Sequence, residues 1–125
     1  MLKYDSIPNI SAISEIDIGN SVTCIGNGAF NGCFDLTSVS IPDSVTNISS
    51  FAFWSCSSLV DVTIPDSVTF VGGGAFQRCF SLSNVHIGTG LTSLGDTLFS
   101  ACRSLSSVTI PYNITSLDYA AFNGC

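Results

Sequence analysis

The chain has 125 residues and a net charge of -6; 46% of its residues are hydrophobic and only 10% are charged, against roughly 25% charged in an ordinary soluble domain. Its basic residues are Lys3, Arg78 and Arg103, too few to neutralise phosphates, so the composition excludes nucleic acid and anionic membrane as expected partners. No apolar run approaches the roughly 18 residues that a membrane span requires, and we expect no membrane insertion.

The first residues, MLKYDSIPNIS, show no signal peptide, because Asp5 and Pro8 interrupt any apolar segment. Ser, Thr, Asn and Gly replace the missing charges along the chain. A polar but uncharged surface is typical of extracellular β-rich repeats. We therefore expect a cell-surface or secreted protein.

The N-terminal residues fit a repeat in weakened form, with Leu2, Ile7 and Ile10 at apolar positions. The full repeat follows, and four positions recur every 23 residues with no insertion or deletion. They are Ile18, Ile41, Ile64, Ile87 and Ile110; Thr23, Thr46, Thr69, Thr92 and Thr115; Phe30, Phe53, Phe76, Phe99 and Phe122; and Cys33, Cys56, Cys79, Cys102 and Cys125. A fixed period of this length predicts a solenoid, whose coils bury their apolar faces against each other.

The first part of each repeat, LxxVxI, alternates apolar and polar residues as a half-buried strand does. Pro42, Pro65 and Pro111, with Gly19 and Gly88 at the same position of other repeats, end these segments. We predict strands near residues 13–18, 36–41, 59–64, 82–87 and 105–110.

The rest of each repeat predicts a second extended segment and a turn. Apolar pairs such as Val45 with Ile48 indicate the extended segment on the far side of the coil. Gly26, Gly72 and Gly95 are expected to supply permissive backbone before AFxxC, which suits one helical or 3₁₀ turn with Phe and Cys pointing inward. Stacked coils then place Ile, Phe and Cys in ladders through the core.

The repeat LxxVxIPxSVTxIGxxAFxxC closely resembles the BspA type of leucine-rich repeat, found in surface proteins of bacteria and parasitic protists. The resemblance implies a repeat solenoid: a right-handed leucine-rich repeat with parallel strands on the concave face and short turns or 3₁₀ segments on the convex face. We expect a single domain over residues 1–125, with about five coils, a degenerate N-terminal half coil and no C-terminal cap. Gly88, Gly90, Leu98 and Asn113 depart from the pattern.

The resemblance further implies adhesion, with the concave strand face as the usual binding surface. Outward residues of the predicted strands are therefore the candidate binding residues, although a merely solvated face would look the same. They are Glu15, Asp17, Ser38, Ser40, Asp61, Thr63, Asn84, His86, Ser107 and Thr109. His86, Asp61 and a hydroxyl lie near one another there, but at a loose diagonal spacing of about 7 Å and with no strained nucleophile turn. We expect no catalysis.

The cysteines at 23-residue intervals do not form a metal motif, because a straight ladder offers at most two adjacent thiols and zinc needs four converging ligands. We predict no metal and no cofactor. Neighbouring coils bring cysteines within disulfide range, so distance alone does not exclude one disulfide. Buried free thiols are nevertheless favoured. Cys24 lies at a different, polar position and is predicted to be the reactive surface thiol.

Three other features have mainly structural interpretations. The run Gly72 to Gly74 lacks the Lys and Ser/Thr of a phosphate loop and predicts a tight turn. Aromatic residues interrupt small or polar positions, which indicates a sticky convex patch or a shield for the Phe ladder; they are Phe34, Phe51, Trp54, Phe70 and Phe80. Sequons at Asn9, Asn47 and Asn113 permit glycosylation without arguing for it.

The leading hypothesis is non-catalytic protein or glycan binding by a surface domain. A self-assembling repeat segment is the alternative, because the final coil is as apolar as an inner one and nothing resembling a cap follows it, which predicts either a longer array or self-association through that coil. An enzyme is a remote alternative.

Overall fold

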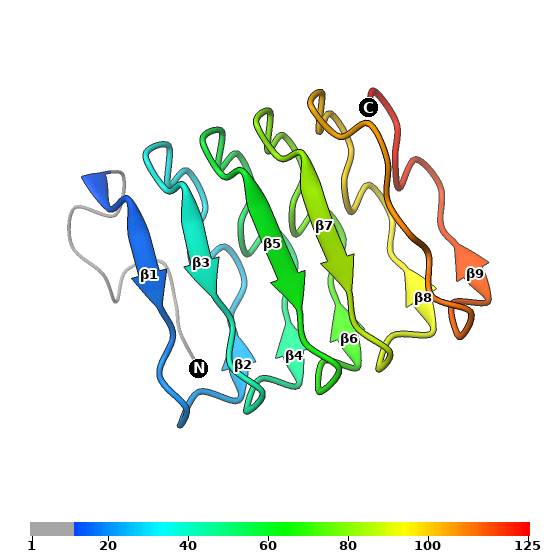
Figure 1. Cartoon of the computed structure of the whole chain (residues 1–125), viewed down its shortest axis with the longest axis horizontal. Helices are drawn as coiled ribbons and strands as arrows, with labels where there is room; N and C mark the ends of the chain where they lie inside the picture. The colour runs from blue at the N-terminus through cyan, green and yellow to red at the C-terminus, as the bar shows by residue number, and fades with distance from the viewer. Residues whose placement is uncertain (1–11) are drawn as a thin grey trace.

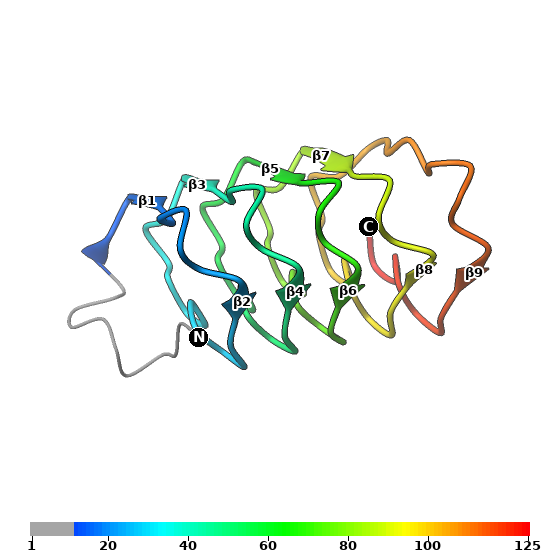
Figure 2. The same cartoon turned by 90° about the horizontal axis from the view of Figure 1, so that it is seen from below.

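The computed structural model describes residues 12–125 as a stack of coils, each wound in parallel with the next (Figure 1). One side carries β1 (Glu15–Asp17), β3 (Ser38–Ser40), β5 (Asp61–Ile64) and β7 (Asn84–Ile87), which we call the long-strand face. The opposite side carries β2 (Cys24–Ile25), β4 (Asn47–Ile48), β6 (Phe70–Val71), β8 (Ser93–Leu94) and β9 (Ser116–Leu117), the short-strand face (Figure 2). The predicted parallel-strand solenoid is confirmed.

The register repeats the sequence period, because each residue pairs with its counterpart one repeat later. Glu15 pairs with Ser38 on the long-strand face, and Ile25 pairs with Ile48 on the short-strand face. Parallel pairing of equivalent residues stacks identical side chains, so the inward ones form continuous ladders and the outward ones form continuous rows. The short extended segments predicted for the far side of the coil are confirmed.

The strand predicted near residues 105–110 is wrong. This segment runs beside β7 in both views (Figures 1 and 2) but carries no strand in the structure. Ile110 is 38% exposed, whereas the equivalent Ile64 is fully buried. The final coil has a neighbour on one side only, so burial that would hold a strand in place is partly missing.

The AFxxC segments form a third side, the turn face, and they are successive turns rather than a helix or 3₁₀ segment. Ala29 N–H donates to the Gly26 carbonyl at 3.1 Å, and Cys33 N–H donates to the Phe30 carbonyl at 3.2 Å. Other N–H groups reach the following coil, as Phe53 N–H does to the Ala75 carbonyl at 2.8 Å. Splitting the hydrogen bonds between local turns and the next coil prevents a continuous helix.

Left-handed backbone recurs at two positions of every repeat, with φ between 55° and 78°. These residues are Gly28, Phe51, Gly74, Thr97 and Ala120, then Gly32, Ser55, Arg78, Ala101 and Gly124. Gly26, Gly72 and Gly95, where permissive backbone was expected, are not among these residues, whereas the predicted tight turn is confirmed at Gly74. Gly72 instead allows close approach, since a Cβ there would lie 2.4 Å from Ser50 N.

The core is built on a stack of phenylalanine rings that runs through all five repeats. Successive ring centroids lie 5.1–5.7 Å apart, and every neighbouring pair is stacked. Phe30, Phe53, Phe76 and Phe99 are fully buried, whereas Phe122 in the last coil is only partly buried. Each inner ring therefore contacts a ring on both sides.

A cysteine ladder lies beside the rings, and the thiols from Cys56 onward bond to the preceding coil. Cys56 Sγ donates to the Phe30 carbonyl at 3.2 Å, and Cys79 Sγ donates to the Phe53 carbonyl at 3.3 Å. All described cysteines are free, and Cys33, Cys56, Cys79 and Cys102 are buried. The free-thiol prediction agrees with this structure.

On the short-strand face, the fourth repeat interrupts the strand pairing, because β6 and β8 belong to separate sheets. In the third repeat, the serine before the apolar position donates a hydrogen bond to the preceding coil, from Ser67 Oγ to the Val45 carbonyl at 2.7 Å. Gly90 takes this serine's place, and a Cβ there would lie 2.3 Å from the Asp66 carbonyl oxygen. The backbones are therefore closer at this point than a serine permits.

The position of a ring in the stack predicts its contribution to stability. Phe76→Ala should cost about 3 to 5 kcal/mol, because the cavity left between two coils is poorly filled. Phe122→Ala should cost clearly less, since that ring has one stacked partner. Chemical denaturation of both variants measures the difference, and equal losses would contradict nearest-neighbour stacking.

Thiol labelling of the native protein should modify Cys24 and Cys125 and spare the four buried cysteines. The contact with the Cys33 thiol and then burial raise the pKa of Cys56, and the Cys102 thiol and burial raise that of Cys79. The folded state thus keeps protons that unfolded thiols lose above their ordinary pKa of 9.0. The stability that these two thiols contribute should be unaffected below that pH and should fall above it. Labelling of Cys79 without denaturant would refute this.

Restoring the repeat pattern at Gly90 should destabilise the protein. We expect Gly90→Ser to cost about 1 to 3 kcal/mol, because the new Cβ meets backbone rather than a flexible side chain. Gly19→Ala is the matched control, since a Cβ there has no atom within 4 Å, and its effect should stay within about 0.5 kcal/mol. A higher melting temperature for Gly90→Ser than for the parent would show the close approach to be unimportant.

Candidate functional site

The long-strand face presents the predicted binding residues to solvent. All ten are exposed, from Glu15 on β1 to Thr109 in the last coil. The alternation that points them outward also points Val62 and Ile64 into the core, at 2% and 0% exposure. Exposure makes these residues available for binding, and a contact role for them stays a prediction.

Four of the ten lie together around one recess between β5 and β7. Asp61 pairs with Asn84 and Thr63 pairs with His86 in the parallel register. These side chains, with Val62 and Val85, line a shallow recess of about 360 Å³. The other six candidates lie outside this recess, on β1, on β3 and in the irregular segment 105–110 that runs beside β7.

The chemistry of the recess favours hydrogen bonding over catalysis. It presents a carboxylate, a hydroxyl, an amide and an imidazole, which together donate and accept hydrogen bonds. Asp61 lies diagonal to His86, since its direct partner is Asn84. Within residues 12–125 no hydrogen bond joins Asp61, Thr63 and His86, so the orientation that a catalytic triad needs is not established there.

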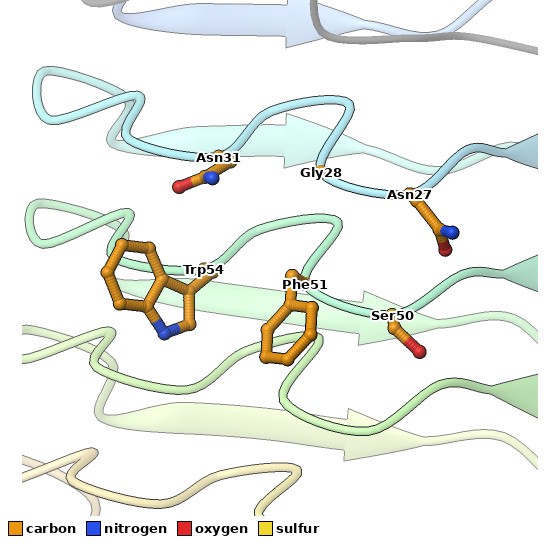
Figure 3. A pocket seen from close by; sticks show the side chains of 6 residues that line it. All are labelled: Asn27, Gly28, Asn31, Ser50, Phe51 and Trp54. Carbon is orange, nitrogen blue, oxygen red and sulfur yellow. The ribbon is translucent and has the colours of Figure 1, made fainter.

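A second depression lies on the turn face, and the sequence indicated it only in part. It has a volume of about 490 Å³ and lies between the first two coils. Its lining residues are Asn27, Gly28, Asn31, Ser50, Phe51 and Trp54 (Figure 3). The two aromatic residues belonged to the predicted sticky patch. Asn27 and Asn31 were missed, because asparagine is common in this chain and nothing in their spacing sets them apart.

The remaining aromatic residues of that patch divide between two faces. Phe80 is linked to the depression's tryptophan through Arg78, whose guanidinium carbon lies 5.7 Å from the Trp54 ring centroid and 5.4 Å from that of Phe80. Arg103 lies 4.7 Å from the Phe80 centroid. Phe70 is 54% exposed on β6, on the short-strand face, and so belongs to a different surface. The single convex patch is therefore smaller than predicted.

The remaining candidate groups have structural partners. Cys24 is half-buried rather than fully exposed, and Asn47 Nδ2 contacts its Sγ at 3.3 Å. The Nδ2 group of Asn113 donates to the carbonyls of Thr89 and Leu91, and Asn9 lies outside the described residues. In the part of the chain that the structure describes, no three His, Cys, Asp or Glu side chains could share a metal ion.

Parallel strands in register at a 23-residue period, with short turns opposite, define a leucine-rich repeat solenoid. The family model described as BspA type leucine rich repeat region matches residues 5–125 in six copies. The chain belongs to this family, as its repeat indicated. None of the curated proteins compared with it matches. Among residues 12–125, no helix is long and apolar enough to cross a membrane.

Solved structures of bacterial leucine-rich repeat proteins share the fold. One from Eubacterium ventriosum has a TM-score of 0.71 and 19% identity, over 90% of this chain and 43% of that chain. A leucine rich cell surface protein from Faecalibacterium prausnitzii has a TM-score of 0.61 and 23% identity, over 90% and 52%. A leucine rich repeat protein from T. pallidum has a TM-score of 0.57 and 31% identity, over 83% and 55%. This chain thus spans about half the length of each.

Proposed function

We propose that this domain binds a protein or glycan without catalysis, through the long-strand face, in a cell-surface or secreted setting. The observation that carries the proposal is the recess between β5 and β7, where four of the predicted residues meet. Membership of the repeat family and the likeness to a protein described as a cell surface protein support the setting.

The shape and chemistry of the face suit recognition of a polar ligand. Its rows of exposed side chains are spaced by the strand separation of about 4.8 Å, so a single ligand can contact more than one row. Glu15, Asp17 and Asp61 make the face acidic, and His86 is its one basic group among the described residues. Such a surface favours a neutral or basic ligand over an acidic one.

Paired substitution of the recess tests the proposal. The protein should show saturable binding on an array of purified extracellular-matrix proteins and glycans. The double variant Asp61→Ala and His86→Ala should weaken that binding at least about tenfold if the recess holds a hot spot. Asp43→Ala is the matched control, because it removes one exposed carboxylate outside the recess. Equal loss in the control, or no loss in the double variant, would contradict the proposal.

A second candidate function is self-assembly through the last coil, and the exposure of that coil favours it. Leu117 is 56% exposed, and Leu105, Val108 and Phe122 line a recess of about 310 Å³ there. A second copy stacked on this surface would cover its apolar side chains. Light scattering across a concentration series without ligand distinguishes the two candidates, because only assembly makes the measured mass rise with concentration.

A further inference from the structure

The depression on the turn face is bordered by two aromatic rings that the core does not require. Phe51 is 49% exposed, whereas the neighbouring ladder ring of Phe53 is fully buried. Figure 3 shows the Phe51 and Trp54 rings side by side, projecting from the same coil with their faces turned toward the viewer. Phe51 is exposed and Trp54 is half-buried, so the two rings together form an apolar platform on this face.

The backbone holds Phe51 in a conformation that a phenylalanine rarely adopts. Its φ is 58°, in the left-handed region that costs a bulky residue about 1–3 kcal/mol. The same position in neighbouring repeats is Gly28 and Gly74. A Cβ built on Gly74 would lie 2.6 Å from the Phe51 ring, so the ring rests closely on the next coil. The ring is thus held on the surface, at a cost in backbone strain.

Polar groups without charge complete the lining. Asn27 is exposed, and Asn31 and Ser50 are half-buried; Figure 3 shows the two asparagines on the preceding coil and Ser50 next to Phe51. Each amide offers two donors and an acceptor, and the hydroxyl can both donate and accept. Arg78 lies over the platform at 5.7 Å from the Trp54 centroid, near the outer limit of about 6 Å for a cation–π contact. The lining itself is neutral.

We propose that this depression binds a neutral pyranose sugar, and this site is separate from the long-strand face. A pyranose has an apolar face of C–H groups that can stack on the rings of Phe51 and Trp54, and equatorial hydroxyls that can bond to Asn27 and Asn31. Because the C–H groups would contact the aromatic rings and the hydroxyls would contact the amides, no polar atom would be buried without a hydrogen-bond partner. A charged peptide would find no partner of opposite sign among the lining residues. A volume of about 490 Å³ lies within the range of about 300–1,000 Å³ usual for small-molecule sites.

Trp54 provides a direct test, because it is the only tryptophan of the chain and its fluorescence reports on this site. The protein is titrated with cellotetraose, maltotetraose and chitotetraose, each to about 10 mM, which reaches dissociation constants in the millimolar range. At least one of them should change the fluorescence in a saturable way. Tetragalacturonate is the acidic comparator, and a response to it alone would overturn the neutral-sugar assignment in favour of a charge contact with Arg78.

The best variant is Phe51→Gly, since glycine already occupies this position in two other repeats and relieves the left-handed strain. The variant should keep its melting temperature or raise it, yet weaken sugar binding about tenfold or more. Asn27→Ala should weaken binding as well, because it removes donors to a hydroxyl. Asp43→Ala is the control and should leave binding unchanged, because this exposed residue lines neither depression.

Two outcomes would overturn the proposal. One is a folded protein whose tryptophan fluorescence responds to none of the three neutral sugars. The other is a response that Phe51→Gly leaves intact. Loss of array binding in the Asp61 and His86 variant, with the fluorescence response preserved, would show two independent sites. Loss of both would show that the sugar site depends on the long-strand face.

Discussion

The register between successive coils is the constraint on which the rest of the structure depends. Backbone hydrogen bonds join successive coils along most of the stack, as with Thr46 N–H to the Thr23 carbonyl at 2.9 Å and Phe53 N–H to the Ala75 carbonyl at 2.8 Å. These bonds align only if every repeat has the same length. A one-residue insertion would move an inward phenylalanine out of its stack, which explains why the 23-residue period is kept without interruption.

This register accounts for what the sequence could predict. Identical residues at a fixed spacing are sufficient to infer stacked parallel strands and buried ladders of Phe and Cys, because the geometry follows from repetition alone. The outward direction of Asp61 and His86 also followed from strand alternation. The end of the array was less predictable: residues 105–110 have the strand pattern of Asp61–Ile64, but the contacts that stabilise a strand there depend on what lies beyond the last coil, and the pattern contains no information about that.

The turn face was predicted least well, because its backbone depends on conformations that its residues do not signal. Only four of the ten left-handed positions are glycine, and the others include Phe51, Thr97 and Arg78, which ordinarily avoid positive φ. Cooperative hydrogen bonding between coils imposes the conformation on whatever residue occupies the position. Propensity at a single residue is therefore a poor guide in a repeat whose neighbours determine its backbone.

Separation of the stabilising and variable positions has a consequence for function. The inward positions are nearly identical from coil to coil and hold the fold, so outward positions can differ without affecting the core. The departures gather at particular coils: Phe51 and Trp54 interrupt small or polar positions, and His86 interrupts hydroxyl positions. Both departures lie at the depressions described here.

A row of identical outward residues would bind a repetitive ligand equally at every coil, whereas a local departure makes one coil bind differently from its neighbours. The irregularities of the repeat are therefore the positions at which binding specificity is expected, and its regularities are the positions at which stability is expected.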